Sequence, residues 1–202
     1  MAIVLDHLEV PLSLSSNAQG AKALGMDEGG RRLLDLMRDR CGLETLAGLD
    51  VLDVGCGVRF TQAIVNQQIP IGSYSGIDVW KEVIDFLSSD VQPLDERFAY
   101  AHWDVRNAMY NEGGTVRLSD VEALPIPGPF DVISMFSVVT HLDADDTRAM
   151  LRLLRRHIRP TGHLFFSAFI GGGIDGYEDR SPEGNPPLSW AFYDRQFMDD
   201  LV

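Results

Sequence analysis

From residue 50 onward, short runs of apolar residues alternate with longer segments in which apolar side chains recur every three or four positions. The short runs have the length and composition of buried strands, and the longer segments have the period of amphipathic helices. We predict strands at residues 51–54, 74–78, 98–103, 130–136 and 163–170. Helices are predicted at residues 60–66, 81–88 and 143–158. This alternation is typical of an α/β fold, so we expect a mostly parallel sheet with helices on both faces.

The chain divides into two parts at the first of these strands. Residues 1–49 contain one amphipathic pattern, at 28–40, and we expect them to form a helical lead-in or cap. Residues 50–202 form the sheet domain, with loops in the glycine- and proline-rich stretches near its end. The sequence Pro160-Thr161-Gly162 should end the helix at 143–158 and turn the chain into the last strand.

Composition narrows the classes of function. The 202 residues include 17 basic and 30 acidic side chains, giving a net charge of −13. Nucleic acid and anionic membrane surfaces would be repelled at long range, so neither is expected as a partner. Cys41 and Cys56 provide no disulfide framework, and the N-terminal stretch lacks the pattern of a signal peptide. We therefore expect a reducing, cytoplasmic setting.

Candidate binding residues stand where the predicted strands end. Two glycines, Gly55 and Gly57, follow the first strand after Asp53, and they allow a sharp turn close to a ligand. Asp78 ends the second strand, about twenty residues along the sequence from this turn, which is the spacing typical of a ribose-binding carboxylate. Asp104 follows the third strand. Each signal alone also fits a plain tight turn or a helix cap. Their order along a parallel sheet favours a crevice for an adenosine-containing cofactor.

These residues together resemble a known family. The sequence Leu-Asp-Val-Gly-Cys-Gly at 52–57, Gly-Ile-Asp at 76–78 and the segments at 130–133, 137–142 and 155–162 are similar to class I S-adenosylmethionine-dependent methyltransferases of the small-molecule type. The resemblance covers about residues 49–169. It implies a Rossmann-like fold, S-adenosyl-L-methionine as cofactor and a small-molecule methyl acceptor.

Position by position, the resemblance implies where the cofactor would bind. The first turn would hold its methionine end, Asp78 the ribose hydroxyls, and residues 79–80 would pack on the adenine. Asp104 would accept a hydrogen bond from the adenine amino group, and Val105 would lie beside the adenine ring. Phe136 would line the sulfonium side. The complete predicted cofactor set is Asp53, Gly55, Cys56, Gly57, Asp78, Val79, Trp80, Asp104, Val105 and Phe136.

Two departures from the family pattern bear on these expectations. The family usually reads Gly-x-Gly-x-Gly-Arg in the first turn, so either Arg59 replaces the third glycine or one residue is deleted here. The Arg59 side chain would either crowd the carboxylate pocket or pair with the carboxylate. The family's sheet also ends with a pair of antiparallel strands. Because the sequence stops at Val202, inside a helix-like pattern, we expect those strands to be missing from this chain.

Methyl transfer is an in-line displacement, so positioning and exclusion of water supply most of the rate. His141 is the histidine best placed to act as a base, although the same residue fits a packing or capping role beside the next helix. No two histidines have the spacing of metal ligands, so no metal is expected. Asp145 and Asp146 fit a solvated helix start.

Two other functions remain open. A nicotinamide-dependent oxidoreductase would use Asp78 equally well, but Phe60 stands where its fingerprint needs a third glycine. A methyltransferase-like binding module without catalysis would explain the altered turn. We expect the enzyme, and a homo-oligomer is left open.

Overall fold

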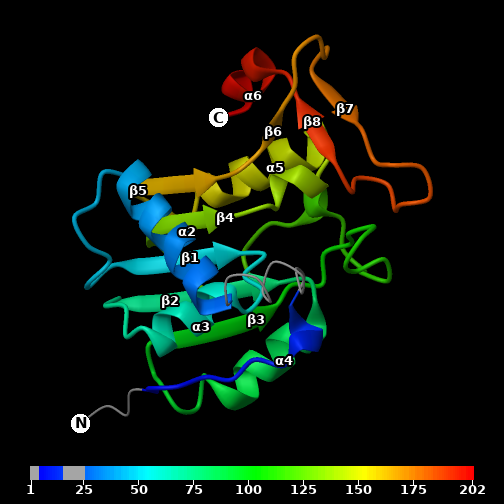
Figure 1. Ribbon diagram of the computed structural model, residues 1–202. Helices are drawn as coiled ribbons and strands as arrows, with labels where there is room; N and C mark the ends of the chain where they lie inside the picture. Colours follow the sequence, from blue (N-terminus) through cyan, green and yellow to red (C-terminus); the bar gives the residue numbers. More distant parts are fainter. Residues whose placement is uncertain (1–4, 16–25) are drawn as a thin grey trace.

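The computed structural model describes residues 5–15 and 26–202, and its centre is a five-stranded sheet (Figure 1). The strands have the spatial order β3-β2-β1-β4-β5, and every neighbouring pair is parallel. Their bounds are Asp50–Val54 (β1), Ser73–Asp78 (β2), Phe98–His102 (β3), Phe130–Met135 (β4) and Ile158–Phe166 (β5). The predicted α/β class with a parallel sheet is confirmed.

Helices cover both faces of this sheet, as expected. The bounds are Met26–Arg40 (α2), Arg59–Asn66 (α3), Lys81–Asp90 (α4) and Ala144–Arg155 (α5). Side chains of β1 alternate between the faces, so that Val51 packs in one hydrophobic cluster with α2, α3 and α4, while Leu52 packs in the other with α5. Because parallel strands are covered on both sides, both faces must be apolar.

The predicted fifth strand at 163–170 is wrong in its bounds. Phe130 pairs with Ile158 and Val132 pairs with His163, so residues 159–162 bulge out of the ladder instead of forming a turn before the strand. Arg159 in this bulge forms ion pairs with the carboxylates of Asp50, at 2.7 Å, and Asp131, at 2.9 Å. Because Ile158 already pairs with Phe130 in the sheet, helix α5 ends at Arg155, three residues earlier than predicted.

A second, smaller sheet was not predicted. It has the order β6-β8-β7, formed by Phe169–Ile170 (β6), Tyr177–Asp179 (β7) and Ala191–Tyr193 (β8), and helix α6 follows at Arg195–Leu201. The Tyr193 hydroxyl donates to the Leu142 carbonyl at 2.7 Å and is 2.7 Å from the Thr147 hydroxyl. These buried contacts hold the small sheet against the start of α5 (Figure 1).

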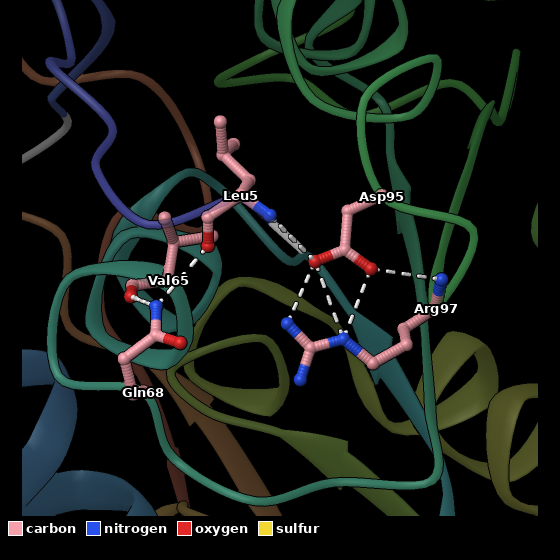
Figure 2. A network of polar contacts seen from close by, with 5 residues as sticks. All are labelled: Leu5, Val65, Gln68, Asp95 and Arg97. Atoms are coloured by element: carbon pink, nitrogen blue, oxygen red, sulfur yellow. Dashed lines mark hydrogen bonds and ion pairs between the residues drawn. The ribbon is translucent and has the colours of Figure 1, made fainter. Parts of the chain in front are cut away.

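The N-terminal segment is pinned along the opposite side of the molecule. The Leu5 amide donates to the buried Asp95 carboxylate at 3.3 Å, and the Leu5 carbonyl accepts from the Gln68 side chain at 3.1 Å (Figure 2). Arg97 binds the same carboxylate at 2.6 Å. Residues 5–11 are extended rather than helical, and the short 3-10 helix η1, Leu12–Leu14, follows them.

Candidate functional site

A cavity of about 480 Å³ opens at the carboxyl ends of β1, β2 and β4. Ten of the eleven residues predicted from the sequence line it. These ten are Asp53, Gly55, Cys56, Gly57, Asp78, Val79, Trp80, Val105, Phe136 and His141. They meet because the ends of parallel strands lie at one edge of a sheet.

The turn after β1 has the backbone that its glycines allow. Gly55 has a φ of +72°, and a Cβ there would lie 2.6 Å from Cγ2 of Val138. Gly57 has a φ of +47°, and no atom lies within 4 Å of the position a Cβ would take. A side chain is therefore excluded at the first glycine, whereas open space at the second lets a ligand approach the backbone.

Asp78 ends β2 and faces this turn. Its Oδ2 accepts from the Gly57 amide at 2.8 Å, and its Oδ1 accepts from the Trp80 amide at 2.9 Å. Burial raises the pKa of this carboxyl, and the two amides partly offset that effect. Each oxygen keeps a further lone pair, so the carboxylate is held in place as an acceptor for a pair of neighbouring hydroxyls.

Asp53 lines the cavity from β1, but both of its oxygens have donors within the protein. The Tyr74 hydroxyl donates to Oδ2 at 2.7 Å, and the Ser134 hydroxyl donates to Oδ1. Burial raises the pKa of Asp53 to about 7, against the effect of the two hydroxyls. This carboxyl therefore connects β1, β2 and β4 beneath the glycine turn.

Asp104 is the predicted residue that does not line the cavity. Its carboxylate accepts from the Thr115 hydroxyl at 2.5 Å and from the Asn111 side chain at 3.2 Å. These two hydrogen bonds lower its pKa, with Thr115 contributing most. The loop after β3 folds back, and its Asn111 and Thr115 side chains donate to the Asp104 carboxylate. The position of this carboxylate therefore gives no support to the predicted adenine contact.

His141 lies in the 3-10 helix η3, Val139–His141, and lines the cavity. Its Nδ1 is 3.1 Å from the Leu188 carbonyl in the loop before β8. A carbonyl only accepts hydrogen bonds, so Nδ1 carries the proton and Nε2 holds the lone pair of the neutral ring. Burial lowers the pKa of His141, and the carbonyls of Leu188 and Ser189 partly offset that effect.

Several lining residues were not predicted as part of the site. Tyr110 comes from the loop after β3, and its ring meets that of His141 edge-on, with 5.8 Å between centroids. Asp146 lines the cavity beside Met150, one helical turn further along α5, and burial raises its pKa. Asp145 and Asp146 do lie in the first turn of α5 as predicted, but only Asp145 is fully solvated, whereas Asp146 is half-buried at the cavity. Leu14, Leu33 and Arg59 bring the N-terminal segment, α2 and α3 to the same cavity.

Across residues 5–15 and 26–202, no group of three or more histidine, cysteine or acidic side chains is arranged to hold a metal ion. Within the same ranges, no helix is long and apolar enough to cross a membrane.

Comparison with known proteins defines the class. A family model described as a methyltransferase domain matches residues 26–181, most of the chain. The chain therefore belongs to this methyltransferase family, as its motifs predicted.

A curated relative is the mitochondrial ubiquinone biosynthesis O-methyltransferase of Candida albicans, 26% identical over 157 residues. The match covers 78% of this chain but 41% of the relative, so this chain corresponds to about two fifths of that protein.

Solved structures share the fold at low sequence identity. Coclaurine N-methyltransferase, crystallised with N-methylheliamine and S-adenosylhomocysteine, aligns with a TM-score of 0.63 and 16% identity, covering 100% of this chain and 58% of its own. The cyclase SpnF aligns with a TM-score of 0.54 and 21% identity, covering 99% of this chain and 61% of its own. The Rossmann-like methyltransferase fold is thus confirmed, whereas a shared fold alone does not specify a reaction.

Proposed function

We propose that this chain binds S-adenosylmethionine in the cavity and transfers its methyl group to a small-molecule acceptor. The observation that carries the proposal is the Asp78 carboxylate, held at the end of β2 by the Gly57 and Trp80 amides and directed at the glycine turn. A carboxylate in this position accepts hydrogen bonds from both ribose hydroxyls of an adenosine cofactor.

The residues present fit this cofactor. Open space above Gly57 leaves room for the chain that joins the ribose to the amino acid end. Val79 and Trp80 supply apolar surface for the adenine on one side of Asp78, and Val105 supplies it from the end of β3. We assign the methionine end to the turn from Gly55 to Gly57 and the sulfonium side to Phe136.

When bound, the cofactor supplies an electrophilic methyl group on a sulfonium. The protein's part is to hold the acceptor in line with that methyl and to exclude water. His141 is our candidate base, because its Nε2 is the ring nitrogen free to take a proton from a hydroxyl or an ammonium. Its lowered pKa keeps the ring neutral at pH 7.

The acceptor class follows from the size of the site. A cavity of about 480 Å³ is within the range of small-molecule sites, roughly 300–1,000 Å³, and is too small to enclose a macromolecule. Two of the proteins named above support this class, since one is named for ubiquinone biosynthesis and the other was crystallised with N-methylheliamine. We also propose a reducing, cytoplasmic setting, because Cys41 and Cys56 are both free thiols.

A second candidate is a protein that binds the cofactor without transferring its methyl group. The specific observation in its favour is the likeness to SpnF, a cyclase whose chain aligns over nearly all of this one. The two candidates share the cofactor site and differ only in whether the methyl group is consumed.

Calorimetry with S-adenosylmethionine, S-adenosylhomocysteine and NAD tests the proposal. We expect both sulfur-containing ligands to bind and NAD not to bind, because Phe60 occupies the position where a pyrophosphate needs glycine. Binding of NAD alone would overturn the proposal. Release of S-adenosylhomocysteine from a panel of hydroxyl and amine acceptors then separates the enzyme from the binding protein.

A matched pair of variants tests the residue that carries the argument. Asp78→Asn removes the charge that two ribose hydroxyls would meet, so S-adenosylhomocysteine should bind roughly 100-fold more weakly or worse. Asp104→Asn makes the same chemical change at the next strand end, outside the cavity, and should alter the affinity less than about threefold. Equal losses in the two variants would remove Asp78 from the proposed site.

A further inference from the structure

Tyr110 lines the cavity from the loop after β3, and two observations place its side chain. Its ring meets the His141 ring edge-on, with 5.8 Å between centroids and an angle of 80° between the planes. Burial raises the pKa of Tyr110, and the nearby charge of Asp78 at the end of β2 raises it further. Because Tyr110 is also 38% exposed, it forms part of the outer wall of the cavity, between η3 and the end of β2.

The loop after β3 holds Tyr110 with its own hydrogen bonds. Asn107 and Asn111 exchange two backbone hydrogen bonds of 3.0 Å, which close a turn over residues 108–110. The Asn107 side chain accepts from the amides of Met109 and Tyr110, both at 3.0 Å, as asparagine commonly does in turns. The Asn111 side chain donates to the Val105 carbonyl at 3.1 Å. The turn that carries the Tyr110 ring is therefore fixed to the base of the loop.

A second loop contacts His141 through a strained residue. Leu188, whose carbonyl is 3.1 Å from Nδ1 of His141, has a φ of +61°. A residue other than glycine keeps such a conformation only where its surroundings hold it. The Asp179 carboxylate does so, since its Oδ2 accepts from the Leu188 amide at 2.9 Å. The imidazole is thus contacted by two loops, each held by hydrogen bonds of its own.

Burial, rather than a charged neighbour, has the largest effect on the pKa of His141, and the carbonyls of Leu188 and Ser189 act against it. A neighbouring ring buries an imidazole without adding a charge, and Tyr110 supplies such a ring. The charged residues that line the same cavity are Asp53 from β1, Asp78 from β2, Arg59 from α3, Arg106 from the loop after β3 and Asp146 from α5.

We propose that Tyr110 is a positioning residue for methyl transfer, whose ring packs against the His141 imidazole and, together with the Leu188 carbonyl, holds it as the neutral tautomer with its lone pair on Nε2. This inference rests on the proposed function and adds a residue that acts through the base. The role belongs to the aromatic ring rather than to the hydroxyl, because the ring makes the contact. Fixing the base in this way removes motion that proton transfer would otherwise have to overcome.

The test compares Tyr110→Leu, which removes the aromatic ring, with Tyr110→Phe, which keeps it. Met109→Ala is the matched control, because Met109 lies in the same turn, is 40% exposed and does not line the cavity. Nuclear magnetic resonance of protein labelled with ¹⁵N-histidine follows the tautomer and pKa of His141, whose signals are identified by their loss in His141→Gln. Thermal unfolding of each variant checks that the fold is intact.

In the wild type we expect the proton on Nδ1 and a pKa below the ordinary histidine value. In Tyr110→Leu water should reach the imidazole, so its pKa should rise toward the ordinary value and the two tautomers should mix. Tyr110→Phe and Met109→Ala should match the wild type.

Kinetics at saturating S-adenosylmethionine, with a hydroxyl or amine acceptor found by the panel above, test the consequence for the reaction. Tyr110→Leu should lower kcat about 10-fold or more and move the acid limb of the pH–rate profile to higher pH. Tyr110→Phe should restore both to the wild-type values. A loss of rate in Tyr110→Leu without the change in pH dependence would count against positioning.

Two outcomes separate failure of this inference from failure of the proposed function. If His141 has the same tautomer and pKa in Tyr110→Leu as in the wild type, the role of Tyr110 is overturned, and the cofactor site stands on its own binding measurements. If S-adenosylhomocysteine does not bind the wild type, the proposed function fails and the inference falls with it, whatever the resonance data show.

Discussion

Replacing Asp53 by asparagine should change how stability depends on pH. The Asp53 carboxyl is 3% exposed, and burial raises its pKa from 3.8 to about 7. The hydroxyls of Tyr74 and Ser134 donate to it and partly offset this effect. Because the folded protein holds the proton more tightly than the unfolded chain, folding is favoured below pH 4, and this contribution is lost as the pH rises through 7.

The magnitude follows from the two pKa values. A difference of about 3 in pKa corresponds to about 4 kcal/mol in total, of which roughly 3 kcal/mol falls between pH 5 and pH 8. Asp53→Asn keeps the shape and removes the ionisation. Its free energy of unfolding should therefore fall less than that of the wild type over this interval, by about 3 kcal/mol.

Urea unfolding at pH 5, 6, 7 and 8, followed by circular dichroism, measures this difference. Asp104→Asn is the control, because the pKa of Asp104 is lowered and its carboxyl stays ionised throughout this interval. Tyr74→Phe removes one donor to the carboxylate and should move the loss of stability to higher pH. A constant difference between wild type and Asp53→Asn from pH 5 to pH 8 would refute the reasoning.

Three further changes follow from other contacts. His141→Gln should lower kcat about 10²-fold or more with a proton-bearing acceptor, as steady-state kinetics would show. In the wild type, the acid limb of the pH–rate profile should have its midpoint below the ordinary histidine value, because burial lowers the pKa of His141; a midpoint above that value would contradict the assignment. Asp95→Asn should cost about 1–3 kcal/mol and release the segment at Leu5 to earlier proteolysis, measured by urea unfolding and timed digestion; unchanged cleavage would count against the anchor. Gly55→Ala should destabilise by about 1–3 kcal/mol in thermal unfolding, since its Cβ would meet Val138 at a positive φ; a neutral result would contradict the close approach.

The sequence alone was sufficient for the parallel sheet and for the centre of the site. Apolar runs of strand length alternate with helical periods, and parallel strands bring their carboxyl ends to one edge whatever the loops do. For that reason the sequence alone predicts that the glycine turn, Asp78 and His141 meet at one edge of the sheet, where all three line the cavity. These positions depend on local patterns repeated in a regular topology.

Tertiary structure alone decided the residues whose direction depends on irregular segments. Asp104 follows a strand as Asp78 does, but the loop after β3 returns Thr115 and Asn111 to its carboxylate. The contact between His141 and the Leu188 carbonyl joins residues 47 positions apart, through a loop with no periodic pattern. Periodicity reports which face of an element is buried, whereas the path of a loop depends on hydrogen bonds between distant residues that no local pattern encodes.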